Sequence, residues 1–318
     1  MPKYRIKHIT RYNYPTPFTD SVNHVMLYPI DDSQQEVKKH DILITQNPPV
    51  EIFTDYFGNR VGMFSLVKQH TELTIQSVIE VITHEPPVIN IENNPKEQWE
   101  ALTVIKEQFP YLDFLMPESC SVIDQIAAVA GERTNEIDSP FAVAQKLSEF
   151  VFNNFEYKKG ITSVETQVEE IWNLKAGVCQ DFAHVLLVML RMVGIPARYV
   201  SGYICPDKQE WRGEGATHAW VEAYLPFQGW TGLDPTNNCI ASDRHVRLAV
   251  GRNFSDCTPV KGTYKGSSEH TLEVSVVIAN GKPAAPEFAE PVFTYVTQQQ
   301  AIPENNSYRR FMEMQQQQ

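Results

Sequence analysis

A cysteine at the start of an apolar helical pattern is the first residue whose setting indicates chemistry. Gly177 permits a tight turn, Cys179 follows it, and apolar residues then recur at helical spacing until Gly194 and Pro196 end the pattern. The remaining faces of the pattern are apolar as well, so the helix is predicted to be buried. A thiol at a helix N-terminus meets the positive end of the helix dipole, which favours the nucleophilic thiolate. Most free cysteines are simply small buried apolar residues, and this stretch alone favours that interpretation of Cys179 over a nucleophile.

Two later stretches supply a base and an acid in the order that a thiol triad requires. Residues 217–225 alternate between polar and apolar and carry His218, and residues 229–234 alternate in the same way up to Asp234, before Pro235 ends the pattern. If the two strands pair as a hairpin with an odd-length loop, His218 and Asp234 become neighbours near its open end. A nucleophilic cysteine, a histidine base and an aspartate that orients the base are the parts of a thiol triad.

In this order, the motifs resemble the bacterial transglutaminase-like superfamily, which shares its catalytic core with papain-like cysteine peptidases. The resemblance rests on several stretches in sequence, and several ordered motifs are more specific than any one. They are 177–184, 194–203, 217–225 and 229–236, then 243–262 with His245 and Gly251, and in the N-terminal part 4–29 and 55–59. The likeness implies that Cys179, His218 and Asp234 form a catalytic triad.

The fold class expected from these patterns is α+β, beginning with an N-terminal antiparallel β-sandwich over residues 1–87. Alternation at 4–12, 42–45 and 73–81 predicts strands, and clusters of turn residues separate them. The Glu85-Pro86-Pro87 stretch marks the linker to the next domain. The family resemblance implies the same kind of all-β domain in front of the core.

Residues 88–280 are predicted to form a papain/transglutaminase-like core, with helices packed on an antiparallel sheet. The expected helices are 97–109, 119–130, 140–154, 163–174 and 179–193, and the expected strands are 197–205, 216–225, 229–234 and 270–278. Residues 281–318 are rich in proline and glutamine, and we expect partial order at best in this tail.

Composition and net charge argue against some classes of binding partner. The chain has 318 residues and a net charge of −12, which argues against a nucleic-acid binder or a protein of anionic membrane surfaces. No apolar run reaches transmembrane length, and the N-terminus opens into a strand pattern without a signal-peptide core. Five cysteines with no Cys-x-x-Cys pair favour reduced thiols, so a cytoplasmic protein is expected. The expected partner is a peptide or protein substrate.

The neighbours of the triad offer candidates for supporting roles. An oxyanion hole needs donors aimed at the developing alkoxide, and the backbone N–H of Cys179 is the natural first one. Gln180, Tyr157 and Trp220 are candidates for a second donor or for lining the site.

Two further residues of the helix motif invite a structural interpretation. Asp181 and His184 lie three apart on the predicted helix, so they can pair, and that pair is expected to support the helix start rather than the chemistry. A zinc site from Cys179, His184 and His218 is an alternative that the spacing does not favour. No acidic loop indicates calcium, so we expect no metal and no cofactor.

The function expected from these residues is thiol-dependent acyl transfer, in which Cys179 attacks a carboxamide or peptide carbonyl. Transfer of the acyl group to water gives a cysteine peptidase or amidase acting on peptide or isopeptide bonds, which is the outcome the sequence analysis favours. Transfer to an amine gives a protein-glutamine transglutaminase. A non-catalytic binding module on the same fold is the alternative of another class, and the presence of all three triad residues disfavours it.

Overall fold

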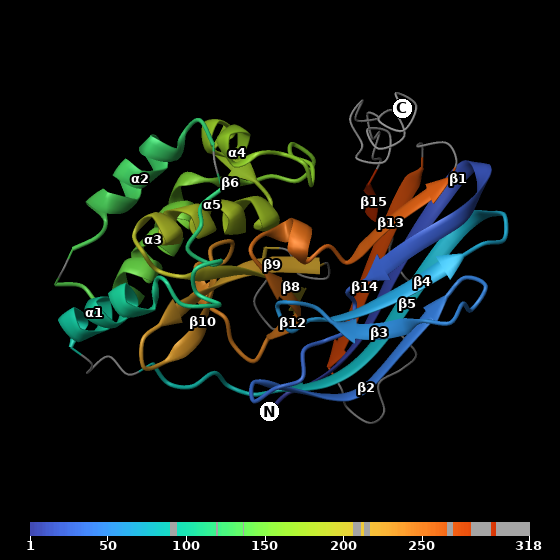
Figure 1. Ribbon diagram of the computed structural model, residues 1–318, viewed down its shortest axis with the longest axis horizontal. Coiled ribbons are helices and arrows are strands. Elements are labelled where there is room, and N and C mark those ends of the chain that lie inside the picture. Colours follow the sequence, from blue (N-terminus) through green and yellow to red (C-terminus); the bar gives the residue numbers. More distant parts are fainter. Residues whose placement is uncertain are drawn as a thin grey trace, which may run out of the picture.

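A computed structural model describes residues 1–89, 94–118, 120–135, 137–205, 211–212, 217–265, 270–280 and 294–296. Its helices gather at one end of the molecule and its longest strands at the other, with a smaller sheet between them (Figure 1). None of the described helices is long and apolar enough to cross a membrane. The mixed architecture confirms the α+β class.

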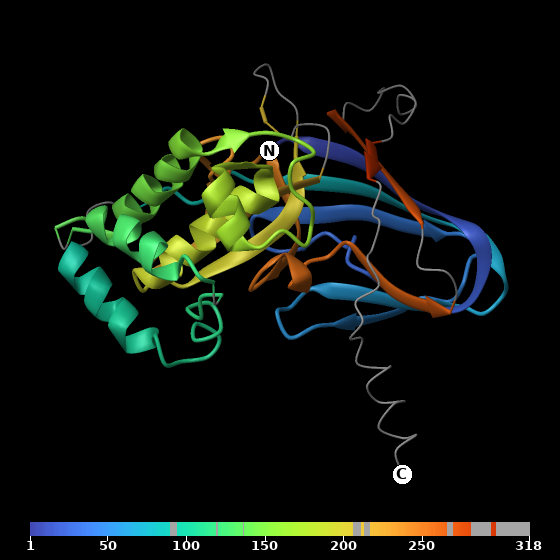
Figure 2. The same ribbon diagram turned by 90° about the horizontal axis from the view of Figure 1, so that it is seen from above.

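The N-terminal strands form one curled sheet that folds over into two layers (Figure 2). They are β1 (Lys3–Val25), β2 (Gln35–Ile44), β3 (Glu51–Thr54), β4 (Arg60–Leu66) and β5 (His70–Thr83). The first half of β1 pairs with β5 and the second half with β4, and register shifts after Asn13 and Thr19 mark the change between the layers. The alternating residues enclose a core that includes Ile6, Leu73 and Ile79.

Three C-terminal strands complete this sheet, which corrects one expectation. They are β13 (Val260–Lys265), β14 (Thr271–Asn280) and β15 (Thr294–Val296). Strand β14 pairs antiparallel with β1, from Tyr4 opposite Asn280 to Asn13 opposite Thr271. The strand expected at 270–278 therefore exists, but its placement in the core sheet is wrong. Alternation predicts a strand without saying which open sheet edge the strand fills.

The five helices of the core are α1 (Pro95–Ile105), α2 (Ile123–Glu132), α3 (Pro140–Asn154), α4 (Val168–Leu174) and α5 (Cys179–Met192). Helix α3 begins as expected, with the Ser139 hydroxyl accepting the Ala142 N–H. Helix α1 ends before the expected 109, and α4 starts after the expected 163, because Ser163 and Thr166 form a local hydrogen-bonded turn. Residue 119, part of the expected second helix, lies outside the described residues.

Helix α5 packs on the core sheet, which has the order β11-β10-β9-β8-β12. The strands are β8 (Ala197–Ile204), β9 (Thr217–Leu225), β10 (Gly229–Asp234), β11 (Cys239–Ile240) and β12 (His245–Gly251). A parallel pair of short strands, β6 (Glu156–Tyr157) and β7 (Ala176–Gly177), leads into α5, and a 3-10 turn, η1 (Phe254–Asp256), follows β12. The hairpin expected from the sequence is β9–β10, with Glu222 opposite Gly232.

The two sheets are tied together by polar contacts. The side chain of Asn59 donates to the carbonyl of Val250 at 2.7 Å and accepts from its N–H at 2.8 Å, so the motif at 55–59 contacts the core sheet. A buried His8 Nδ1 lies 2.8 Å from the Tyr203 hydroxyl, and Arg247 forms an ion pair with Asp32 at 2.6 Å. The division of the chain at residues 87 and 280 stays a prediction.

Candidate active site

The turn before α5 is shaped by a carboxylate that folds back over a glycine. Asp181 Oδ2 accepts hydrogen bonds from the Val178 N–H at 2.7 Å and from the Thr162 hydroxyl at 2.6 Å. A Cβ atom on Gly177 would lie only 2.4 Å from that oxygen, so a larger residue would displace the carboxylate. The backbone therefore enters the helix in a fixed direction, with Cys179 at its first position.

His218 and Asp234 meet across the β9–β10 hairpin. The His218 Nε2 atom lies 2.8 Å from Asp234 Oδ2, and both side chains are fully buried. Nε2 donates to the carboxylate, so the unprotonated form of the ring has its lone pair on Nδ1. Asp234 Oδ1 in turn accepts the N–H groups of Thr236 and Asn237 at 2.9 and 3.3 Å, in the turn that Pro235 starts.

The second ring nitrogen of His218 is the one left for a contact with Cys179. Nδ1 is buried and makes no hydrogen bond within the described part of the chain. Cys179 is nevertheless close enough to contribute to the raised pKa of His218, and it is only partly buried. Cys179, His218 and Asp234 thus lie in one place, with the histidine between the other two.

Charge holds the buried pair in its ionised form. Burial disfavours the imidazolium of His218, but the charge and hydrogen bond of Asp234 outweigh burial and raise the pKa of the ring. Burial likewise opposes ionisation of Asp234, and the two histidine contacts overcome it and lower the pKa of that carboxyl. An imidazolium beside an ionised carboxylate is the state that supports a thiolate on the far side of the ring.

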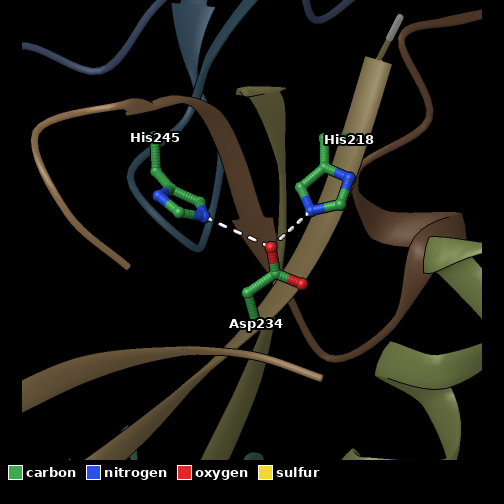
Figure 3. A group of neighbouring side chains, drawn as sticks. All are labelled: His218, Asp234 and His245. Carbon is green, nitrogen blue, oxygen red and sulfur yellow. Dashed lines mark hydrogen bonds and ion pairs between the residues drawn. The ribbon is translucent and has the colours of Figure 1, made fainter. Parts of the chain in front are cut away.

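A second histidine on Asp234 is a site residue that the sequence analysis missed. His245, at the start of β12, lies on the other side of the carboxylate from His218, with its Nε2 3.4 Å from the same Oδ2 atom (Figure 3). Its Nδ1 accepts the Ser242 N–H at 3.1 Å, so the proton of the neutral ring is on Nε2. Burial lowers the pKa of His245 although Asp234 opposes that shift, so the ring acts as a neutral donor. Its only sequence signal was its place in the 243–262 motif.

These three residues also form the one group of possible metal ligands among the described residues. The ligand atoms of His218, Asp234 and His245 lie within 4.8 Å of one another. The Ser242 N–H argues against a metal, because it occupies the Nδ1 lone pair of His245 and so leaves the proton on Nε2, where a metal would need a free lone pair. The zinc set of Cys179, His184 and His218 is not brought together as such a group in the described residues.

Of the candidates for supporting roles, Tyr157 and Gln180 both lie near Cys179, but in different settings. Tyr157 pairs with Gly177 through β6 and β7, and burial, followed by the charges of Cys179 and Asp234, raises its pKa to about 12. Its hydroxyl is therefore protonated and near Cys179. Gln180 donates weakly to the Val164 carbonyl at 3.4 Å and lines the cavity beside the site.

Trp220 packs against both histidines of the site. It is fully buried, with its ring centroid 6.1 Å from that of His218 and 5.1 Å from that of His245. A Cβ atom on Gly202 would approach the Trp220 ring to 2.7 Å, so that glycine leaves the ring its space. Trp220 therefore packs the back of the site, its Nε1 has no hydrogen-bond partner within the described residues, and its role as a donor or lining residue stays a prediction.

The expected pair of Asp181 and His184 is not formed. Asp181 is engaged by Val178 and Thr162, and His184 Nε2 instead accepts the Phe254 N–H at 3.2 Å. Burial lowers the pKa of His184 to about 4, which suits an acceptor. Helical spacing allowed the pair, but each side chain has a closer backbone partner. His184 thus connects α5 to the turn after β12.

Two family models match parts of this chain. Residues 127–235 match the family model of the transglutaminase-like superfamily, and residues 4–82 match that of the bacterial transglutaminase-like N-terminal region. An uncharacterized protein of Mycobacterium leprae is 32% identical over 283 residues, which cover 87% of this chain and 99% of that relative. The chain belongs to the transglutaminase-like superfamily.

Two further comparisons concern fold and sequence separately. The crystal structure of a candidate cysteine protease from Cytophaga hutchinsonii superposes with a TM-score of 0.68 at 20% identity, covering 93% of this chain and 98% of that one, and shows the same fold. A protein-glutamine gamma-glutamyltransferase of Pseudomonas aeruginosa is 34% identical over 104 residues, which are 30% of this chain and 15% of that protein.

Proposed function

We propose that the chain is a thiol acyl-transfer enzyme that cleaves peptide or isopeptide bonds. The observation that carries the proposal is the buried His218 ring, whose Nε2 is held by Asp234 while Nδ1 is left without a partner beside Cys179. A base with one nitrogen fixed and the other free next to a thiol is arranged to exchange one proton with sulfur.

The reaction follows from these positions. The thiolate of Cys179 attacks the carbonyl carbon, and the negative charge moves to the carbonyl oxygen. The Cys179 N–H at the start of α5 and the Tyr157 hydroxyl are the proposed donors to that oxygen. The imidazolium of His218 then gives its proton to the leaving amine, and the acyl group stays on sulfur as a thioester.

The acceptor of the acyl group distinguishes two activities. Water, activated by the neutral His218, returns the thiol and a carboxylic acid, and it needs no binding site of its own, so hydrolysis is the outcome for which the described residues suffice. The similarity to a protein-glutamine gamma-glutamyltransferase favours an amine acceptor as the second candidate. Both share the acyl-enzyme, and mass measurement of products with and without a primary amine separates them.

The test of the shared step is trapping of the covalent intermediate with a peptide-amide library, read by intact mass. Wild-type protein should gain the acyl mass on Cys179, Cys179→Ala should not, and His218→Ala should lose nearly all of it. His184→Ala is the matched histidine control, and it should keep the intermediate in the fraction that folds. Loss of the intermediate in His184→Ala with retention in His218→Ala would overturn the assignment of the base.

Alkylation gives a second measure that needs no substrate. Cys179 should react with iodoacetamide below neutral pH and faster than Cys120, since a thiolate reacts and a thiol does not. Burial raises the pKa of Cys120, which makes that partly buried thiol a suitable slow reference within the same chain. Equal rates at the two cysteines would remove the basis for an activated nucleophile.

A further inference from the structure

We infer that the cavity between the N-terminal β-sandwich and the core is the pocket for an uncharged aromatic or aliphatic side chain of the acyl donor. The inference rests on the proposed function of Cys179. It gives the β-sandwich a direct part in substrate binding.

The cavity begins next to the proposed nucleophile and base. Its wall includes Gln180, the residue after Cys179, and Thr217, the residue before His218. From there it extends over η1 to the inner faces of β1, β13 and β14. Its volume of about 540 Å³ is within the range of roughly 300–1,000 Å³ that is usual for ligand pockets. A peptide whose carbonyl reaches Cys179 can therefore place a neighbouring side chain inside it.

Aromatic rings from the β-sandwich form one wall of the cavity. The Tyr12 ring stacks near Tyr14 at a centroid distance of 6.4 Å and lies 5.5 Å from the His270 ring. Tyr14 contacts Tyr264 edge to face at 5.3 Å. All four rings line the cavity, and Leu73, Leu272 and Val274 add aliphatic surface. Rings already packed against one another need little reorganisation to receive another apolar group.

The described wall is electrically neutral where it is buried, which decides against a charged occupant. His8 lines the cavity, but its Nδ1 is bonded to the Tyr203 hydroxyl at 2.8 Å and its Nε2 to the Thr10 hydroxyl at 3.1 Å. Burial lowers the pKa of His8 to about 4, so the ring carries no charge. The two charged lining residues, Glu165 and Lys261, are exposed to solvent. A charged side chain inside would lose its hydration without gaining a counter-charge.

The test measures how well peptides protect Cys179 from iodoacetamide, so that it reports binding without turnover. The probes are blocked peptide amides that differ at one position only, as Phe, Leu, Ala, Glu or Lys. The Phe and Leu peptides should half-protect Cys179 at concentrations roughly 10- to 100-fold lower than the Ala peptide needs, because their side chains bury more apolar surface. The Glu and Lys peptides should protect no better than the Ala peptide.

Two variants that fill the cavity from different elements should remove this preference. Thr258→Trp acts from the end of η1, with Thr258→Val as its volume-matched control, and Val274→Phe acts from β14, so that one variant remains if the other does not fold. Protection is expressed relative to the unprotected alkylation rate of the same variant. In each filled variant the Phe and Ala peptides should then half-protect Cys179 at concentrations that agree to within about 3-fold.

The outcomes separate the pocket from the nucleophile. Equal protection by all five peptides in the wild-type protein, or an unchanged Phe preference in both filled variants, overturns the pocket and leaves the proposed function standing. Alkylation of Cys179 no faster than Cys120 in the wild-type protein overturns the proposed function, and the pocket with it.

Discussion

Replacing Tyr157 by Phe removes one hydroxyl from beside Cys179 and tests the proposed oxyanion donor. The ring should keep its place, because it contacts Phe182 edge to face at 6.3 Å and its backbone stays paired with Gly177. Loss of one oxyanion donor costs about 10²- to 10³-fold in rate. Strands β6 and β7 have two residues each, so the donor can shift slightly, and we expect the lower figure, about 10²-fold.

The assay compares two reactions of the same thiol. Acyl transfer from a peptide amide places charge on oxygen, whereas alkylation by iodoacetamide does not, so Tyr157→Phe should slow acylation about 10²-fold and leave alkylation within about 2-fold of wild type. The effect should appear in kcat, with KM little changed. Tyr224→Phe, on the partly buried ring that contacts Trp230 at 5.5 Å, is the matched control. Equal loss in both reactions would mean that Tyr157 only supports the structure, and no loss in either would exclude it as a donor.

Three further predictions concern the triad, the helix start and acid stability. Asp234→Ala should reduce acylation of Cys179 by roughly 10- to 10⁴-fold but leave measurable turnover, because the carboxylate orients the base without reacting; complete loss in a folded variant would contradict this. Gly177→Ala should lower the thermal midpoint and the alkylation rate together, since its Cβ would lie 2.4 Å from the carboxylate that caps α5; an unchanged midpoint would contradict it. Burial lowers the pKa of His8 and His184 to about 4 from 6.5, so the stability that comes from their neutral rings is present above pH 6.5 and is lost as the pH falls towards 4. For each ring, the free energy of unfolding falls by up to about 1.4 kcal/mol for each pH unit of acidification in that window. The urea midpoint should therefore be lower at pH 5 than at pH 7, and the difference should be smaller in His8→Gln. Equal midpoints at the two pH values would refute the assignment.

Local pattern was enough to predict the elements that carry the three residues of the proposed triad. Helix α5 runs from Cys179 to Met192, and the β9–β10 hairpin covers the two stretches that alternate in the sequence. The side-chain period of a strand is two, so a hairpin with a given loop fixes which residues share a face. His218 and Asp234 could therefore be expected as neighbours before any tertiary contact was known.

Contacts between distant segments could not be predicted in the same way. Strand β14 has the alternation expected of a core strand, yet it pairs with β1. In this pairing Asn280 lies opposite Tyr4, which is more than 250 residues earlier in the chain. The expected pair of Asp181 and His184 obeys helical spacing, and it fails because the Thr162 hydroxyl and the Phe254 N–H reach these side chains first. Neither competitor falls within a window of about 11 to 18 residues, which is the range over which periodicity is informative.

The Asp234 carboxylate shows why the missed residue matters to the chemistry. A fully buried carboxylate is protonated unless hydrogen bonds and charge replace its lost hydration. Asp234 gains them from the Thr236 and Asn237 N–H groups, from the Asn237 amide at 2.8 Å, from His218 and from His245. His245 adds a donor without adding a competing charge, because the Ser242 N–H fixes its neutral tautomer. We propose it as a positioning residue: with His245 in place, Asp234 stays ionised and its charge is available to hold His218 as an imidazolium beside Cys179.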